Sequence, residues 1–380
     1  MSPMPGHNGK FLSLEAGRGI AALLVVMCHA ANGIANNGIQ AAPLYITMFS
    51  VGSSGVDFFF VLSGFIILFV HYDDINRPDR LRNYLASRFI RVVPIYWIAL
   101  VMMIAIRVWM FADHLHPSLA DVVWSALLQP TEHDGFYVLI AWTLQYEIVF
   151  YGVFAILLLN KRAGMALFAG WIGWIAFANI TGSGKLSPVT GLHNLEFFGG
   201  LAAAYVLRNH RLPMGRGILG AGVSIFVITL LVESSMPVVA DRYWVIYGFA
   251  SVLIVLGAVE AERRLRLTVP APLIALGSAS YSIYLFHYCV LQALASYTVK
   301  RADQAVGLAA LTGAAPAPAV ESYLSWLVPV TCFVSYSVFA VVLGMVISRR
   351  VEFPLIRVIR SVMSGQKTVA GSALAATGQG

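Results

Sequence analysis

Residues 55–70 read Gly55-Val-Asp-Phe-Phe-Phe-Val-Leu-Ser-Gly-Phe-Ile-Ile-Leu-Phe-Val70, with Asp57 as the one charged side chain. With the apolar residues before it, this run is long enough to cross a hydrocarbon core, which takes about 20 residues of helix. The whole chain of 380 residues has the same character, with 59% hydrophobic and 11% charged residues. A soluble chain carries about 25% charged residues. The composition therefore predicts an all-α, polytopic membrane protein.

Hydropathy places about ten transmembrane helices along the chain. We expect one transmembrane domain over residues 1–360 and a polar, disordered cytoplasmic tail over 361–380. The shorter apolar segment 119–129 is too short to span and is typical of an interfacial or re-entrant piece. The ten expected spans are 13–31, 44–71, 89–112, 137–159, 164–181, 193–208, 217–232, 243–259, 273–297 and 323–348.

Lysine and arginine cluster in every second loop, which is the mark of cytoplasmic loops. The loop 32–43, by contrast, has neither residue. Both termini are therefore expected in the cytoplasm, and the net charge of +7 indicates topology rather than nucleic-acid binding. The 3 cysteines lie in apolar stretches and offer no CxxC spacing, so no metal site is expected. The basic segments are 77–88, 161–162, 208–216, 263–266 and 349–360.

Ionisable residues inside the spans are the candidates for function, because each costs at least about 2.5 kcal/mol to insert. Arg18 and His29 lie eleven positions apart, which at about 100° per residue puts them on one helical face, about 16 Å apart along the axis. Histidine suits general-base catalysis because its ordinary pKa is near neutrality. The alternative is that Arg18 is a flanking arginine that reaches the interface and His29 a structural histidine at a helix end.

Two carboxylates, Asp57 and Glu147, fall within expected spans and need a partner or a proton. For Asp57, a structural hydrogen bond to a neighbouring helix is an equally good explanation. For Glu147, the attractive partners are Arg18 and His29. Glu196 and His287 raise the same question, and for these two we favour structural pairing.

Arg88 and Arg91 stand three positions apart at the start of the third expected span, so their guanidinium groups face the same way. A guanidinium group matches phosphate oxygens in two-point hydrogen bonding. By themselves, two arginines at this position are better explained as the cytoplasmic flank of the span. Arg91 lies inside the apolar run, beyond where topology requires a charge, and this strengthens the case for phosphate binding.

These motifs, taken together and in order, resemble the acyltransferase-3 family of bacterial membrane O-acyltransferases, which modify exported and cell-surface polysaccharides. The resemblance extends over most of the chain, from Leu14 to Ile356. The matching segments are 14–29 with Arg18 and His29, 55–65 with Asp57, 88–97 with Arg88 and Arg91, 142–151 with Glu147, 196–199, 280–287 and 351–354.

The resemblance implies an enzyme of the bacterial inner membrane that transfers an acyl group, commonly acetyl, from cytoplasmic acyl-CoA to a sugar hydroxyl. The acceptor would be a free or lipid-linked carbohydrate, in contact with membrane lipid. Arg88 and Arg91 would bind acyl-CoA, and His29 would be the base or acyl carrier, assisted by Arg18, Glu147 or Asp57. Two other functions stay open from the residues alone: a transporter or flippase for a lipid-linked glycan, and a non-catalytic partner of a polysaccharide synthase.

Overall fold

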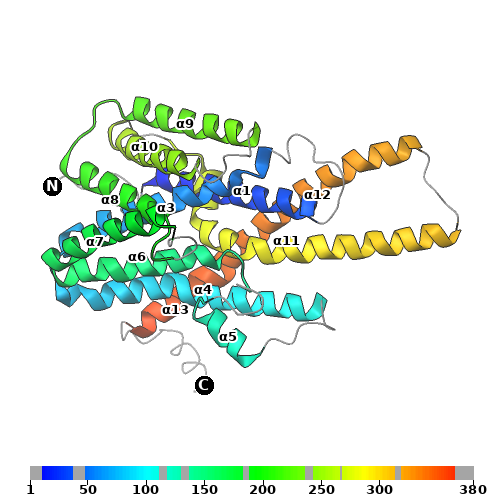
Figure 1. Cartoon of the computed structure of the whole chain (residues 1–380), viewed down its shortest axis with the longest axis horizontal. Helices are drawn as coiled ribbons and strands as arrows, with labels where there is room; N and C mark the ends of the chain where they lie inside the picture. Colours follow the sequence, from blue (N-terminus) through cyan, green and yellow to red (C-terminus); the bar gives the residue numbers. More distant parts are fainter. Residues whose placement is uncertain are drawn as a thin grey trace, which may run out of the picture.

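The computed structural model describes residues 11–36, 48–110, 118–129, 137–182, 188–235, 243–265, 268–312 and 318–363. Every regular element in these ranges is a helix, as the composition predicts (Figure 1). The expected tail 361–380 lies outside the described residues, apart from 361–363, which end the last helix.

The apolar runs of the sequence form helices that end at polar or turn residues. One such junction lies between α6 and α7, where the Asn160 side-chain oxygen accepts a hydrogen bond of 3.0 Å from the Ala163 backbone N–H. This caps the first turn of α7 and separates the two helices. The α-helices are α1 (Leu12–Asn36), α3 (Gly55–His71), α4 (Leu81–Met110), α5 (Leu119–Ala126), α6 (Ala141–Leu159), α7 (Lys161–Ile180), α8 (Asn194–Asn209), α9 (Gly215–Ser235), α10 (Tyr243–Leu265), α11 (Ala271–Thr312), α12 (Pro318–Ile347) and α13 (Phe353–Met363).

Short helical segments of other types connect some of these elements. Three are 3₁₀-helices, and the π-helical segment η6 joins α12 to α13 without a break. These segments are η2 (Gly52–Ser54), η3 (Tyr72–Asp74), η4 (Pro78–Arg80) and η6 (Ser348–Glu352).

Within the described residues, 9 segments are long and apolar enough to cross a membrane, rather than the ten expected. The difference is α8, which covers the expected span 193–208 but has only 16 residues. A helix of that length is about 24 Å long, shorter than the hydrocarbon core of about 30 Å. The segment α5 has 8 residues and is likewise too short, as its sequence predicts.

Helix α8 nevertheless runs parallel to α3 over its whole length. At their first turns, Glu196 and Asp57 lie on either side of His193. At the opposite ends, an Arg208 Nη2 atom lies 2.6 Å from Asp73 Oδ2 in an ion pair. The two helices therefore begin on one side of the molecule and end on the other.

Glycines allow two close contacts between helices. A Cβ atom at Gly200 of α8 would collide with the Val61 carbonyl oxygen of α3, and one at Gly277 of α11 would collide with the Glu15 carbonyl oxygen of α1. Small residues permit this approach of backbones, which is the usual basis of helix packing in membranes. The α3–α8 and α1–α11 contacts position the two groups of polar residues described below.

In Figure 1, α1 and α3 lie near the middle of the bundle, with α9 and α10 along one side and α4, α6 and α7 along the other. Helices α11 and α12, in yellow and orange, extend beyond the other helices and diverge toward their far ends. The main hydrophobic core includes residues of α1, α3, α4, α6, α8 and α11. The polar residues discussed next are thus enclosed by apolar packing.

Candidate active site

A cavity of about 90 Å³ lies between α1, α3, α4, α6 and α11. It brings together four of the six residues singled out in the sequence: Arg18, Arg88, Arg91 and Glu147. These residues come from three helices, so only the tertiary structure makes them neighbours. The other polar residues that line the cavity are Ser63, Thr143, Tyr151, Ser280, Tyr281 and Tyr284.

Positive charge predominates in this cavity. Arg18 forms an ion pair of 3.4 Å with Glu15, which is not among the lining residues. Arg88 stacks over the Tyr151 ring at 5.6 Å, and its buried Nε atom has no hydrogen-bond partner among the described residues. Among the described residues, no carboxylate oxygen lies within 4.0 Å of an Arg91 side-chain nitrogen. Three guanidinium groups with one lining carboxylate make the cavity suitable for an anion.

Glu147 is the carboxylate that lines the cavity, and it accepts hydrogen bonds from two hydroxyl groups. Ser63 Oγ donates a hydrogen bond of 3.3 Å to Glu147 Oε1, and the Tyr151 hydroxyl, one helical turn further along α6, donates to the same oxygen. The structure thus places these two hydroxyls in contact with Glu147, in place of the Arg18 or His29 suggested by the sequence.

His29 lies apart from the lining residues and pairs with His287 of α11. Its Nδ1 atom is 3.0 Å from His287 Nε2 and 3.1 Å from the Val25 carbonyl oxygen. The other ring nitrogen of His287, Nδ1, is 3.2 Å from the Ile283 carbonyl oxygen. Tyr284 connects the two regions, because it lines the cavity and its ring centroid is 5.8 Å from that of His287.

These contacts fix where the protons of a neutral pair reside. A carbonyl oxygen can only accept, so His287 Nδ1 carries a proton and donates it to Ile283. His287 Nε2 is then an acceptor, and His29 Nδ1 must donate to it. His29 Nε2 is consequently left with a free lone pair, as a general base requires.

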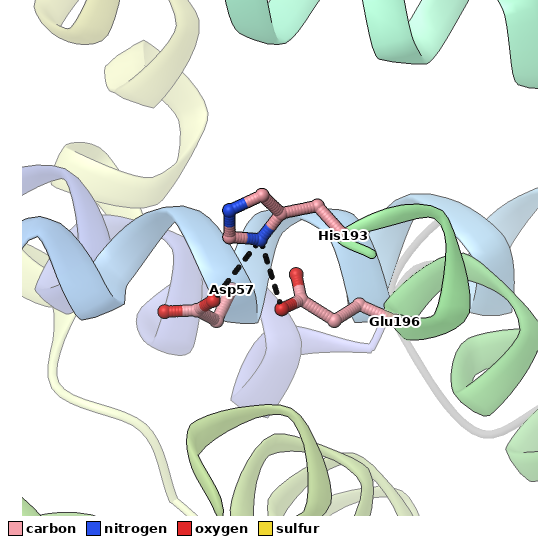
Figure 2. A group of neighbouring side chains, drawn as sticks. All are labelled: Asp57, His193 and Glu196. Carbon is pink, nitrogen blue, oxygen red and sulfur yellow. Dashed lines mark hydrogen bonds and ion pairs between the residues drawn. The ribbon is translucent and has the colours of Figure 1, made fainter. Parts of the chain in front are cut away.

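Asp57 is the remaining candidate, and it does not line the cavity. It lies at the start of α3 beside His193 and Glu196, as Figure 2 shows. Sequence reasoning did not select His193. The available signal was its position three residues before Glu196, a spacing that puts both side chains on one face at the start of a helix.

The chain belongs to the acyltransferase-3 family, because a family model described as an acyltransferase domain matches residues 11–349. It is therefore an acyltransferase, and the transporter and non-catalytic alternatives are set aside. The membership and the 9 apolar segments long enough to span together indicate a multi-pass membrane protein.

Curated relatives support this assignment. The chain is 32% identical over 281 residues to the "Exopolysaccharide production protein ExoZ" of Rhizobium meliloti (strain 1021), covering 69% of this chain and 82% of that protein. It is 25% identical to the "Acyltransferase MdmB" of Streptomyces mycarofaciens, covering 76% and 81%. It is 26% identical to the "Putative acetyltransferase ORF330" of Acidianus two-tailed virus, covering 71% and 80%. No solved structure matches the chain.

Proposed function

We propose that this acyltransferase resides in the bacterial inner membrane and transfers an acetyl group from cytoplasmic acetyl-CoA to a sugar hydroxyl of an exopolysaccharide or related surface glycan. The name of the Rhizobium relative supports a polysaccharide acceptor, and the name of the viral relative supports acetyl as the acyl group. The observation that carries the proposal is the His29–His287 hydrogen bond, which leaves His29 Nε2 unprotonated in the neutral pair.

Arg88, Arg91 and Arg18 form the donor site of this proposal, where their guanidinium groups bind the phosphates of CoA. Arg88 supports a cytoplasmic position for this site, because its Nη2 atom lies 3.4 Å from His71, at the end of α3 that precedes the basic segment 77–88. Glu147 offsets part of the positive charge when no donor is bound.

The thioester end of the donor would then have to approach His29, which lies about 16 Å further along α1 than Arg18. The flexible pantetheine arm between the phosphates and the thioester of CoA suits that separation. Tyr284 lies along this route, since it lines the cavity and contacts the His287 ring.

The reaction proceeds by general-base catalysis. His29 Nε2 takes the proton of the sugar hydroxyl while the hydroxyl oxygen attacks the thioester carbonyl. The tetrahedral intermediate collapses, the carbon–sulfur bond breaks, and the CoA thiolate takes the proton back from His29. An acyl-histidine route would use the same Nε2 atom as the nucleophile.

The test compares His29→Ala with wild type in a host that lacks the gene, with glycan acetylation measured by mass spectrometry. We expect loss of acetylation although the variant accumulates in the membrane at the wild-type level. His210→Ala is the matched control, because His210 is exposed in the loop after α8, and it should retain acetylation. Undiminished acetylation in the His29→Ala strain would rule out the proposed base.

A further inference from the structure

Three side chains outside the cavity converge from the first turn of α3 and the start of α8: Asp57, His193 and Glu196 (Figure 2). His193 Nδ1 lies 3.1 Å from Glu196 Oε1 and 3.6 Å from Asp57 Oδ1. One ligand-type atom from each residue lies within 4.8 Å of the other two. Both carboxylates are almost fully buried, since the side chains of Asp57 and Glu196 are 7% and 2% exposed.

The charge of this cluster is not balanced by the protein. Two ionised carboxylates carry two negative charges, and a protonated His193 supplies one positive charge. Among the described residues, no lysine or arginine nitrogen lies within 4.0 Å of Asp57 or Glu196. An uncompensated charge in the interior is strongly unfavourable, so the cluster requires a further cation or further protons.

Two oxygens of the cluster also lack hydrogen-bond partners among the described residues. Asp57 Oδ1 and Glu196 Oε2 are buried and accept no hydrogen bond within the described part of the chain. Buried polar atoms in native proteins are nearly always bonded, and an orphaned one can mark an unseen ion. The unpartnered Asp57 oxygen is the same atom that faces His193 Nδ1.

We propose that Asp57, His193 and Glu196 bind a Zn²⁺ ion. Zinc ligands lie about 2.0 to 2.2 Å from the metal, so ligand atoms in a tetrahedral site are about 3.3 to 3.6 Å apart. The separations of 3.1 and 3.6 Å in this cluster lie close to that range. A neutral imidazole and two carboxylates would balance the divalent charge, and three protein ligands leave the fourth position for water or a hydroxyl.

The ion would link α3 to α8 immediately behind the cavity. Phe60 lies between the cavity and the cluster, because it lines the cavity and its ring centroid is 5.8 Å from that of His193. The rings of Trp142 and Trp244 also lie near His193, with centroids at 5.7 and 6.0 Å. The spacing of His193 and Glu196 alone does not predict this site, because Asp57 is distant in the chain and none of the three ligands is a cysteine.

The test is a titration of the full-length protein, purified in detergent and stripped with EDTA, with Zn²⁺ followed by calorimetry and metal analysis. We expect uptake of one Zn²⁺ per chain and a rise in the unfolding temperature, because the ion binds the folded state. If the stripped wild-type protein takes up no stoichiometric Zn²⁺, the site holds protons instead and the proposal is wrong.

The variants Asp57→Asn and Glu196→Gln keep the side-chain shape and remove one charge each, and each should weaken Zn²⁺ binding at least about tenfold. Asp79→Asn is the matched control, since Asp79 has a side chain that is 71% exposed, and it should bind Zn²⁺ as wild type does. Equal Zn²⁺ affinity in all four proteins would place any bound zinc elsewhere and overturn the assignment. None of these measurements depends on the acyltransferase mechanism.

Discussion

His287 is fully buried, and both of its ring nitrogens have a defined partner. It does not act on substrate in the proposed mechanism. Its effect is on His29, whose Nδ1 proton it accepts and whose ring it thereby orients. His287 is accordingly a positioning residue, and its contribution can be separated from a purely structural one by the choice of substitution.

We predict that His287→Ala lowers kcat by about a hundredfold, because a misoriented catalytic group can cost that much, while the KM for acetyl-CoA changes little. His287→Gln should retain more activity, since its amide oxygen can accept the proton from His29 Nδ1. Steady-state kinetics of the purified variants provide the measurement. Equal losses in the alanine and glutamine variants would contradict the positioning role.

Arg88 and Arg91 are the residues on which the donor site depends. A hydrogen bond to a charged group contributes about 1.5 to 3 kcal/mol, so Arg88→Ala and Arg91→Ala should each weaken acetyl-CoA binding about tenfold or more. Binding would be measured at constant ionic strength. The exposed Arg82 of the same helix supplies the control Arg82→Ala. If Arg82→Ala weakens binding equally, the effect is one of general charge and not of a phosphate site.

At the scale of elements, close packing between α1 and α11 is what brings His29 to His287. Gly19 and Gly277 lie at this contact, and a Cβ atom at Gly19 would be 2.9 Å from the Gly277 backbone nitrogen. The contact is near the end of α1 that carries Arg18, and His29 and His287 lie further along the same two helices.

We predict that Gly277→Ala destabilises the protein by about 1 to 3 kcal/mol, as overpacking typically does, and lowers acyl transfer. The matched control is Gly220→Ala in α9, where an added Cβ meets no described atom within 4 Å. Alanine favours helix over glycine by about 1 kcal/mol, so the control should be neutral or stabilising. Thermal unfolding in detergent compares the two. A similar loss of stability in both would show that packing at Gly277 is not the cause.

At the scale of the whole molecule, the membrane topology depends on whether α8 crosses the membrane. Its 16 residues make it shorter than a typical span. Its first turn nevertheless lies beside that of α3, through Glu196 and Asp57, and Arg208 in its last turn pairs with Asp73 of η3, directly after α3. If α8 crosses the membrane alongside α3, the alternation of basic loops is preserved and both termini lie in the cytoplasm.

Topology reporters test this threading. We predict that a reporter fused after residue 36 is periplasmic and that reporters fused after residues 80 and 210 are cytoplasmic. The fusion after residue 210 tests α8 specifically, since it follows that helix directly. A periplasmic readout there, with the other two as predicted, would mean that α8 does not cross. An inverted readout after residue 36 or 80 would contradict the charge argument itself.

The sequence by itself determined the membrane-type helices, most of their limits and the residues worth examining. Hydropathy is a local property, so the run at 55–70 is sufficient to predict a helix without knowledge of its neighbours. The expected span 193–208 forms a helix, α8, but its 16 residues are fewer than a typical span needs, so its crossing of the membrane stays a prediction.

Only the tertiary structure decided which polar residues meet. It joined Glu147 to Tyr151 and Ser63, His29 to His287, and Asp57 to His193 and Glu196. The sequence of an apolar helix does not show which of its faces will pack against which other helix. Close contacts such as those at Gly200 and Gly277 decide this. The physical reason is that pairing depends on the packing of helices distant in the chain, which no local pattern records.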